Sequence, residues 1–294
     1  MNSSLTASVV VPVLNGEATL GNLLAALKNQ AGAGPFEIIV VDNGSTDRTI
    51  EIARSSGVTV LHQPIRGPSA ARNLGLHHAR ADIVVFTDSD TIPSRRWLAS
   101  LLAAFADPDV IIATGPILGW KPATAAERYS SARVIFSRKN TAEHPRYSYA
   151  AGMNIAVRRK NAIEIGAWDE SMTSGEDMDF CFRLRLRFGN KIHFIEEAVL
   201  FHQHRCSDEA LWRQARWHGT GHALFHQRHL RWTALHSAMV YLTIGLLYLA
   251  VPVIAFARRV GLMSAERAEF EYYYRLWTRH FWAGFFKQRK RKTT

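Results

Sequence analysis

Short runs of β-branched and other apolar residues alternate with helical patterns over the first two thirds of the chain. The runs are continuous rather than alternately apolar and polar, as expected for strands that a parallel sheet buries on both faces. We expect strands at Ser8–Val13, Glu37–Val41, Val58–Leu61, Ile83–Phe86 and Val110–Thr114. Helical patterns lie between them at Ala18–Asn29, Asp47–Ser55, Ser69–His77 and Ser94–Ala106. This order predicts a doubly wound, Rossmann-like α/β fold with a mainly parallel sheet of the nucleotide-binding kind.

With 294 residues, 47% of them hydrophobic, the chain is long enough for one large α/β domain with a small appendage. Its last third becomes helical, aromatic and basic, so we expect a first domain over residues 1–206 and a helical region over 207–294. Met1–Ser8 has neither a basic nor an apolar segment, and we expect no secretory leader. Cys181 and Cys206 lack the spacing of a metal site and are expected to be reduced thiols of a cytosolic domain.

The helical region carries three features that favour a membrane. Residues 237–257 are uncharged and mostly apolar, and as a helix they would span roughly one bilayer core, with a kink at Pro252. Aromatic residues recur at helical spacing over 270–286, which predicts an amphipathic helix in a membrane interface. A basic tail at 287–292 contributes to the net charge of +11. The alternatives are that both segments pack on the first domain and that the tail is solvated.

Polar residues follow three of the expected strands at their carboxyl ends. Leu14–Gly16 follows the first strand, Asp42–Asp47 the second and Thr87–Asp90 the fourth. Any one of these segments could be a turn, because Asp, Asn, Gly and Ser favour turns for local reasons. Ligands of open α/β sheets, however, bind beyond the carboxyl ends of the strands. Three polar segments at equivalent strand ends therefore favour a ligand site.

Asp88 and Asp90 are the most informative residues of this set. Two carboxylates one residue apart on a tight loop can share a hard divalent cation, and oxygen ligands suit Mg²⁺ or Mn²⁺. Such an ion would neutralise a diphosphate and help it to leave. An Asp-x-Asp sequence often occurs by chance, and its place directly after the buried run Ile83–Thr87 is what favours the metal site here.

A set of segments in order resembles the landmarks of the family 2 glycosyltransferases, a large inverting family with the fold called GT-A. The segments are Val9–Asn15, Val41–Asp47, Arg66–Gly75, Thr87–Asp90 and Gly175–Asp179. The resemblance covers about residues 5–205 and implies a metal-dependent transfer of a sugar from a nucleotide-diphosphate donor. It specifies the family but no substrate.

The resemblance implies a set of donor contacts. It assigns the nucleotide and its diphosphate to Pro12, Val13, Asp42, Asn43, Arg72, Asp88 and Ser89. The family often has a second Asp where this chain has Asn43, which leaves the choice of base open. Arg72 would support the carboxylates or the diphosphate. The alternative is an ordinary ion pair on a helix that Ser69 caps.

Three acids, Glu176, Asp177 and Asp179, stand at an expected loop-to-helix junction. The helix dipole alone favours acids in a first turn, and this is the alternative explanation. The resemblance assigns the general base to Asp177, which would take the proton of the acceptor hydroxyl as it attacks the sugar. Glu176 and Asp179 would then support the loop or contact the acceptor.

Further residues complete the expected site by resemblance. Asn154, beside Gly152, would hydrogen-bond the donor sugar, or the segment is a strand with a glycine bulge. His202 would join Asp88 and Asp90 at the metal, with His204 as its rival. An element like the Arg/Gln-x-x-Arg-Trp motif of membrane synthases would place three residues near the acceptor and the diphosphate: Arg213, Arg216 and Trp217. A basic helix over the membrane surface is the alternative for this element.

These expectations combine into one hypothesis about partners and location. The donor is a nucleotide-diphosphate sugar, with a UDP-sugar favoured, and the acceptor is a lipid-linked or envelope glycan. Nucleotide sugars are cytosolic, so the first domain should be cytosolic. A single crossing by 237–257 would put Arg258, Arg259 and the tail on the far side, against the positive-inside tendency. We therefore expect a peripheral or monotopic protein at the cytosolic face of the membrane.

Three other functions are weighed against this hypothesis. A sugar-1-phosphate nucleotidyltransferase would open with a glycine- and arginine-rich phosphate loop, which Leu14–Glu17 is not. A non-catalytic scaffold is disfavoured because Asp88, Asp90 and Asp177 are intact. A nucleic-acid-binding protein would fit the positive charge, but acidic strand ends repel phosphates unless a metal intervenes. No nucleic acid is expected as a partner, and the oligomeric state stays open.

Overall fold

The computed structural model describes residues 5–133, 137–144, 147–189, 191–230, 233–249 and 251–290. The chain divides into two compact units. The first combines the chain up to Trp120 with the described residues between 134 and 203. The second combines Lys121–Arg133 with the described residues from His204 onward. The excursion of Lys121–Arg133 into the second unit is a feature that the sequence did not indicate.

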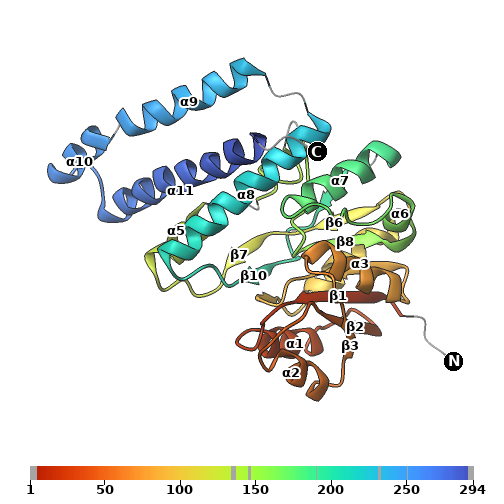
Figure 1. Ribbon diagram of the computed structural model, residues 1–294. Helices are drawn as coiled ribbons and strands as arrows, with labels where there is room; N and C mark the ends of the chain where they lie inside the picture. The colour runs from red at the N-terminus through yellow and green to blue at the C-terminus, as the bar shows by residue number, and fades with distance from the viewer. Residues whose placement is uncertain are drawn as a thin grey trace. The chain divides into compact units, whose positions relative to one another are not determined.

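The larger sheet of the first unit has the strand order β3-β2-β1-β4-β8-β6-β9 (Figure 1). Its strands are β1 (Ala7–Val13), β2 (Phe36–Asp42), β3 (Thr59–His62), β4 (Ile83–Phe86), β6 (Ile112–Thr114), β8 (Ile155–Arg158) and β9 (Ile192–Phe194). The neighbours β3, β2, β1 and β4 pair in parallel, whereas β8 is antiparallel to both β4 and β6. The predicted α/β class and mainly parallel sheet are confirmed, with β8 as an inserted antiparallel strand.

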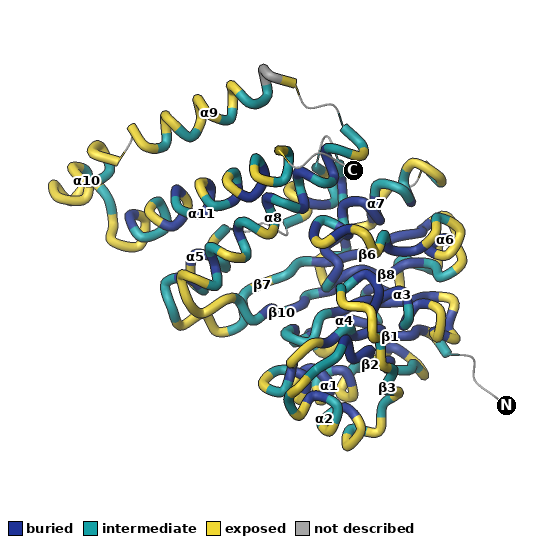
Figure 2. The backbone as a smooth tube through the Cα atoms, viewed as in Figure 1, coloured by how far each residue is buried: buried dark blue, intermediate teal, exposed yellow. Residues whose placement is uncertain are grey.

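Alternate residues of the buried strands enter two separate cores, one on each face of the sheet. Val9 and Val11 pack with one set of helices, and Val10 and Ile39 pack with the other. The first face is covered by α1 (Leu20–Lys28), α2 (Thr49–Ser55), α4 (Trp97–Ala103) and a 3₁₀ turn at Ala104–Ala106. The second is covered by α3 (Pro68–His78), α6 (Arg159–Glu164) and α7 (Glu176–Phe188). Burial on both faces explains the continuous apolar runs (Figure 2).

A close approach of α3 to the sheet positions the part of the site that this helix carries. A Cβ on Gly75 would lie 2.3 Å from Val10 Cγ1, so only a glycine lets the helix lie this near to β1. The first turn of α3, with Arg72 beyond it, is thereby held beside the carboxyl ends of β1 and β4.

A smaller sheet has the strand order β5-β10-β7, and its strand β5 begins directly after the Asp-x-Asp loop. Its strands are β5 (Thr91–Pro93), β7 (Ile117–Gly119) and β10 (Leu200–His202). β10 runs antiparallel to β5, and the register places His202 opposite Thr91. Because β5 starts directly after Asp90, this pairing brings a residue from the far end of the unit beside the loop.

The second unit is built on α5 (Ala125–Ala132), α8 (Asp208–His229) and α11 (Ala265–Arg289). The helices α8 and α11 run side by side in the same direction, since Asp208 binds Tyr273 near their starts and Gly219 meets Phe281 further along. Four aromatic side chains of α11 are buried in this unit: Tyr273, Trp277, Phe281 and Phe285. Tyr273, Trp277 and Phe281 pack with Leu211 and Ala215 of α8 and with Tyr129 of α5.

The structure corrects one expectation and refines another in this unit. The aromatic face predicted to lie in a membrane interface, within residues 270–286, is occupied by α8 and α5 instead. The described residues of the apolar segment 237–257 belong to α9 (Ala234–Leu249) and α10 (Val251–Arg259), and Pro252 is the second residue of α10. The stretch His236–Arg259 is long and apolar enough to cross a membrane, and none of its most apolar window is buried (Figure 2).

Candidate functional site

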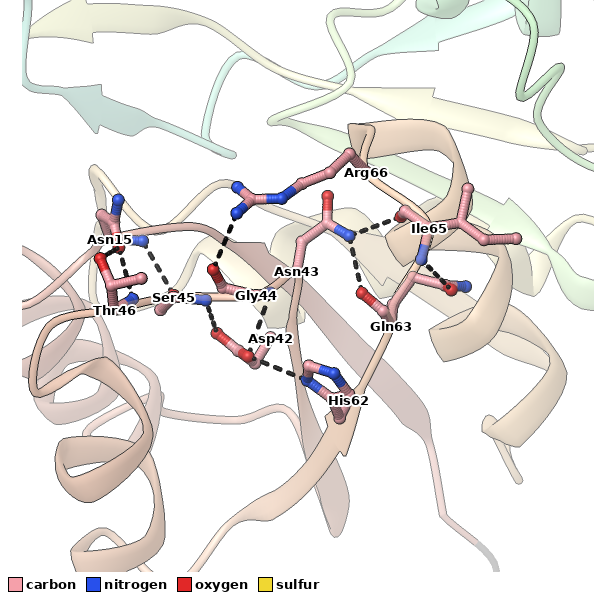
Figure 3. A network of polar contacts seen from close by, with 10 residues as sticks. All are labelled: Asn15, Asp42, Asn43, Gly44, Ser45, Thr46, His62, Gln63, Ile65 and Arg66. Carbon is pink, nitrogen blue, oxygen red and sulfur yellow. Dashed lines mark hydrogen bonds and ion pairs between the residues drawn. The ribbon is translucent and has the colours of Figure 1, made fainter.

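The loops after β1 and β2 are tied together by hydrogen bonds between side chains and backbone. The amide of Asn15 donates to Ser45 Oγ at 2.9 Å, and the amide of Thr46 donates back to Asn15 Oδ1 at 2.9 Å (Figure 3). Asn15 has a positive φ of 53°, a conformation that asparagine tolerates better than most residues. Of the residues expected along the nucleotide, Val13 is buried in the core and Pro12 is half-buried.

Asp42 and Asn43 end β2 in different surroundings. The carboxylate of Asp42 accepts hydrogen bonds from the amides of Gly44 and Ser45, both at 3.1 Å, and lies 3.2 Å from His62 Nδ1. Burial opposes ionisation of Asp42, but these hydrogen bonds outweigh it and hold the pKa of its carboxyl below the usual value. The group is therefore ionised at neutral pH.

Asn43 is engaged with the loop that leads into α3 (Figure 3). Its Nδ2 donates to the carbonyl oxygens of Gln63 and Ile65, at 3.0 and 2.7 Å. Its Oδ1 accepts from the amide of Gly67 at 2.8 Å. The side chain that the sequence assigned to base recognition thus uses both of its amide hydrogens to fix this loop.

The Asp-x-Asp loop brings Asp88, Ser89 and Asp90 to the end of β4. Its turn is fixed by Thr91, whose Oγ1 donates to the carbonyl oxygen of Asp88 at 2.8 Å. The loop adjoins the β1 loop, since a Cβ on Gly16 would lie 3.3 Å from Ser89 Oγ. The backbone amide that follows His202, that of Gln203, donates to the carbonyl oxygen of Asp90 at 2.9 Å.

His202 reaches this loop through the pairing of β10 with β5. Its Nε2 lies 3.5 Å from Asp90 Oδ2, and the ring is almost fully buried. The rival His204 belongs to the second unit. His202 thus lies against a predicted metal ligand.

Arg72 joins two groups of acids. Its Nη2 donates to Asp88 Oδ1 at 2.9 Å, and its Nη1 donates to Glu176 Oε1 at 3.0 Å. The side chain is only 4% exposed, and its guanidinium lies over the ring of Trp168, 4.9 Å from the centroid. A buried guanidinium needs such partners, because leaving its positive charge unpaired costs several kcal/mol, roughly 3–5. Arg72 thus connects the β4 loop with the start of α7.

Asp177 follows Glu176, the partner of Arg72, on the first turn of α7. Its Oδ1 accepts from the amide of Met178 at 2.8 Å and its Oδ2 from the amide of Gly152 at 3.3 Å. Burial raises the pKa of Asp177 to about 7, and the neighbouring charge of Glu176 adds to the rise, whereas Arg72 opposes it. A carboxyl with a pKa near the working pH is suited to accept a proton from a reacting hydroxyl.

Two other predicted residues have structural partners. Asn154 is fully buried: its Oδ1 accepts from Trp97 Nε1 at 2.8 Å, and its Nδ2 donates to the carbonyl oxygen of Gly115 at 3.0 Å. Its amide thus connects Trp97 of α4 with the carbonyl oxygen of Gly115, which lies between β6 and β7, and the contact of Asn154 with the donor sugar stays a prediction. Asp179 pairs with Arg183 at 2.7 Å, on the buried side of α7.

Arg213, Arg216 and Trp217 lie on α8, in the second unit. Arg213 pairs with Glu209 at 3.0 Å, and Arg216 Nη1 lies 2.8 Å from His280 Nδ1. The Trp217 side chain is exposed. The structure therefore places these three residues together on one helix of the second unit.

The acids and His202 fit a cation that takes some of its ligands from the protein and the others from a bound nucleotide. In the part of the chain that the structure describes, no three His, Cys, Asp or Glu side chains are arranged to hold a metal by themselves. Asp90 and His202 lie together, while Asp88 is turned to Arg72. Mg²⁺ and Mn²⁺ are commonly held by one or two carboxylates and by substrate phosphates. The donor set of oxygens and one imidazole suits such an ion.

Residues that the sequence analysis missed complete the site. Trp168 lies under Arg72 and stacks on Phe180, and its backbone amide and carbonyl are both held by the side chain of Asn73. His62 ends β3 directly beside Asp42. The expected third strand ends at Leu61, one residue short of His62, and a full count of the strand in register with β2 would have found it.

Comparisons with known proteins agree with this site. The model of glycosyl transferase family 2 matches residues 8–166, more than half of the chain. The pre-mycofactocin glycosyltransferase of Mycobacterium tuberculosis is 34% identical over 207 residues, which cover 67% of this chain and 43% of that protein. The chain thus spans less than half the length of this curated relative.

Two solved structures resemble the fold of this chain. The mannosyltransferase PcManGT from Pyrobaculum calidifontis, in complex with GDP-Man and Mn²⁺, superposes with a TM-score of 0.71 at 19% identity and covers 99% of this chain and 89% of that one. Glucosyl-3-phosphoglycerate synthase from Mycobacterium tuberculosis, in complex with Mn²⁺, UDP and glucosyl-3-phosphoglycerate, superposes with a TM-score of 0.58 at 24% identity. It covers 76% of this chain and 80% of its own. These likenesses show that the fold is GT-A.

The family match, the fold and the order of the strand-end segments agree with one another. The matched residues include Asp42, Arg72, Asp88 and Asp90, which the fold gathers at the carboxyl ends of β2 and β4 and at the first turns of α3. The chain belongs to glycosyl transferase family 2.

Proposed function

We propose that this chain transfers a sugar from a nucleotide-diphosphate donor to an acceptor hydroxyl, with inversion and with the help of Mn²⁺ or Mg²⁺. The observation that carries the proposal is the buried Arg72, which holds Asp88 of the β4 loop and Glu176 of α7 in one contact network. One guanidinium thereby links the acids that would face the diphosphate with the acid pair that would face the acceptor. The complexes of the two structural relatives, one with GDP-Man and one with UDP, support a nucleotide donor.

The metal would be held by Asp88, Asp90 and His202 together with the diphosphate of the donor. A bound Mn²⁺ or Mg²⁺ would neutralise charge that develops on the leaving diphosphate. The protein's own contribution is positional. The β5–β10 pairing holds His202 against Asp90, and Arg72 holds Asp88 in place before the donor arrives.

Asp177 would be the general base. In a direct displacement the acceptor hydroxyl attacks the sugar on the face opposite the diphosphate, and its proton must leave during the attack. The hydrogen bonds from Gly152 and Met178 orient the Asp177 carboxylate. Its pKa of about 7 gives a large ionised fraction at neutral pH together with enough basicity to take the proton.

The acceptor would be a lipid-linked or envelope glycan, reached from the cytosolic face of a membrane. The exposed apolar surface of α9 and α10 supports this part of the proposal, since large side chains such as Leu242, Leu246 and Phe256 are all more than half exposed. Contiguous apolar surfaces of this kind mark contacts with membranes or proteins. The helices would lie in the cytosolic leaflet without crossing it, which keeps Arg258 and Arg259 on the cytosolic side.

Asp177→Asn tests the assignment of the base. The variant should bind the donor nucleotide with unchanged affinity, because Asp177 would contact the acceptor side, and should transfer sugar about 10²–10⁴-fold more slowly. Binding is measured by titration calorimetry and transfer by product formation with a membrane extract as acceptor source. Asp169→Asn, which changes an acid in the loop before α7, serves as a control. Full transfer by Asp177→Asn would place the base elsewhere.

A further inference from the structure

A buried acid and an exposed histidine form a pair at the carboxyl ends of β2 and β3. Asp42 and His62 are direct partners in the parallel register, and His62 Nδ1 lies 3.2 Å from Asp42 Oδ2. The Asp42 side chain is 2% exposed, whereas the His62 side chain is 63% exposed. The acid therefore meets the solvent through the imidazole ring rather than directly.

The side chain of Asn43, the other polar residue at the end of β2, already has hydrogen-bond partners within the protein. Asn43, which follows Asp42, donates both amide hydrogens to the backbone of the loop at Gln63 and Ile65 and accepts from Gly67. The carboxylate of Asp42 accepts hydrogen bonds from the amides of Gly44 and Ser45 and contacts His62. Of the side chains Asp42, Asn43 and His62, the imidazole is the one that extends into solvent where a nucleotide would arrive.

The negative charge of Asp42 determines which ring nitrogen of His62 carries the hydrogen in the neutral imidazole. A carboxylate only accepts hydrogen bonds, so His62 Nδ1 must carry the hydrogen that lies between them. In the neutral ring the other nitrogen, Nε2, is then an acceptor. The pair thus presents one hydrogen-bond acceptor on a flat, exposed ring. Arg66, held over Gly44 by a hydrogen bond of 3.2 Å to its carbonyl oxygen, adds a positive charge nearby.

We propose that His62 contacts the nucleobase of the donor and selects bases with a ring N–H beside a carbonyl group. Uracil, thymine and guanine carry such a hydrogen, which can be donated to Nε2. Cytosine and adenine carry a lone pair at the corresponding ring nitrogen, which faces the lone pair of Nε2 and leaves both unsatisfied. This inference rests on the proposed function, since it assumes that the nucleotide of the donor binds at these strand ends.

The test measures binding of UDP, GDP, dTDP, CDP and ADP to the full chain in detergent with Mn²⁺ at pH 8, by titration calorimetry. The nucleotide that binds best is then compared with its counterpart methylated on the ring nitrogen, 3-methyl-UDP or 1-methyl-GDP. We expect CDP, ADP and the methylated nucleotide to bind about tenfold more weakly, since the loss of the hydrogen bond to His62 Nε2 is worth roughly that factor.

Two substitutions and a control locate the effect. His62→Ala and His62→Phe should bring the methylated and unmethylated nucleotides within about twofold of each other, because neither side chain has an acceptor. His77→Ala, at an exposed histidine near the C-terminal end of α3, should keep the wild-type ratio. Phenylalanine should retain more affinity overall than alanine, because it keeps a flat ring for the base to stack on.

The outcomes separate this inference from the function on which it rests. Nucleotides that bind with metal dependence but with equal affinity for methylated and unmethylated bases would overturn the role of His62 and leave the glycosyltransferase proposal intact. The same holds if the wild-type preference survives in His62→Ala. If none of the five nucleotides binds, the proposed function fails, and the inference fails with it.

Discussion

At the scale of single residues, the site depends on the way in which burial and charge oppose each other around Arg72 and Asp177. Burial and the neighbouring charge of Glu176 raise the pKa of Asp177 and Arg72 lowers it, and the net result is a pKa of about 7. Arg72 in turn is buried with Asp88 and Glu176 as its partners. The basicity of Asp177 is thus set by a residue that also holds the β4 loop.

Arg72→Gln should therefore change both the pH dependence and the stability. In the wild type, kcat/KM should rise with pH about tenfold per unit below pH 7 and level off above it, because the base must be ionised. Loss of the Arg72 charge should move this midpoint to higher pH. It should also lower the free energy of unfolding by about 3–5 kcal/mol, since the buried Glu176 and the half-buried Asp88 lose their partner.

Arg187→Gln provides the matched control for this prediction. Arg187 pairs with Glu164 at 2.7 Å, but both side chains are exposed, so its loss should change the free energy of unfolding by less than about 1 kcal/mol and leave the pH profile unaltered. A pH profile for Arg72→Gln with the wild-type midpoint would show that Arg72 does not tune the base.

At the scale of elements, the second unit depends on a close contact between α8 and α11. A Cβ on Gly219 would lie 1.9 Å from the carbonyl oxygen of Phe281, and a Cβ on Gly284 would lie 2.0 Å from that of Arg216. Neither backbone can move away without separating the helices and exposing the buried aromatic side chains of α11. Two glycines therefore set the distance at which these helices pack.

Gly219→Ala should force α8 and α11 apart and lower the free energy of unfolding of this unit by about 1–3 kcal/mol or more. Hydrogen exchange should accelerate in α8 and α11 while the sheet of the first unit stays protected. Gly245→Ala in α9 is the control, because nothing lies within 4 Å of its Cβ position and alanine favours a helix. Equal protection of α8 in Gly219→Ala and in the wild type would rule out the close contact.

The sequence predicted the first four strands of the larger sheet closely and did not indicate the pairing of the smaller sheet. The buried runs that became β1 to β4 are continuous and flanked by turn residues, so the expected bounds differ by one residue at most. Strands such as β5, β7 and β10 have only three residues each, too few for a pattern. Pairing between β5 and β10 is set by tertiary contacts, and it is this pairing that brings His202 to Asp90.

Some side chains of the site could be predicted from the sequence, and others could not. Acids at strand ends are visible in the sequence because parallel strands align their carboxyl ends. The sequence cannot tell whether an amide side chain such as Asn154 faces a ligand or the backbone of distant strands, since both need the same hydrogen-bonding groups. Asn154 bonds Trp97 and Gly115, which are distant from it in the sequence.

At the scale of the whole molecule, the exposed apolar helices bear on where the enzyme works. The chain should float with liposomes that contain anionic lipids when it is centrifuged through a density gradient. The double substitution Leu246→Glu with Phe256→Glu should reduce the bound fraction at least about tenfold, because each side chain is exposed in the protein and would lose roughly 1.5–3 kcal/mol of burial in lipid.

Leu186→Glu is the control for membrane binding, since Leu186 is an even more exposed apolar residue, on α7 of the first unit. It should bind liposomes as the wild type does. If the α9–α10 variant floats as well as the control, these helices do not attach the protein to lipid, and the proposal of a membrane-bound acceptor loses its support.

The central claim is that the chain is a metal-dependent transferase that uses a nucleotide sugar. The most direct measurement is nucleotide release from a panel of UDP-, GDP- and dTDP-sugars, in detergent, with Mn²⁺ or with EDTA. We predict that one donor is hydrolysed with Mn²⁺, that EDTA abolishes the reaction, and that Asp90→Asn reduces it strongly because Asp90 would hold the metal beside His202. Silence across the panel, with no metal-dependent binding of any nucleotide, would contradict the claim.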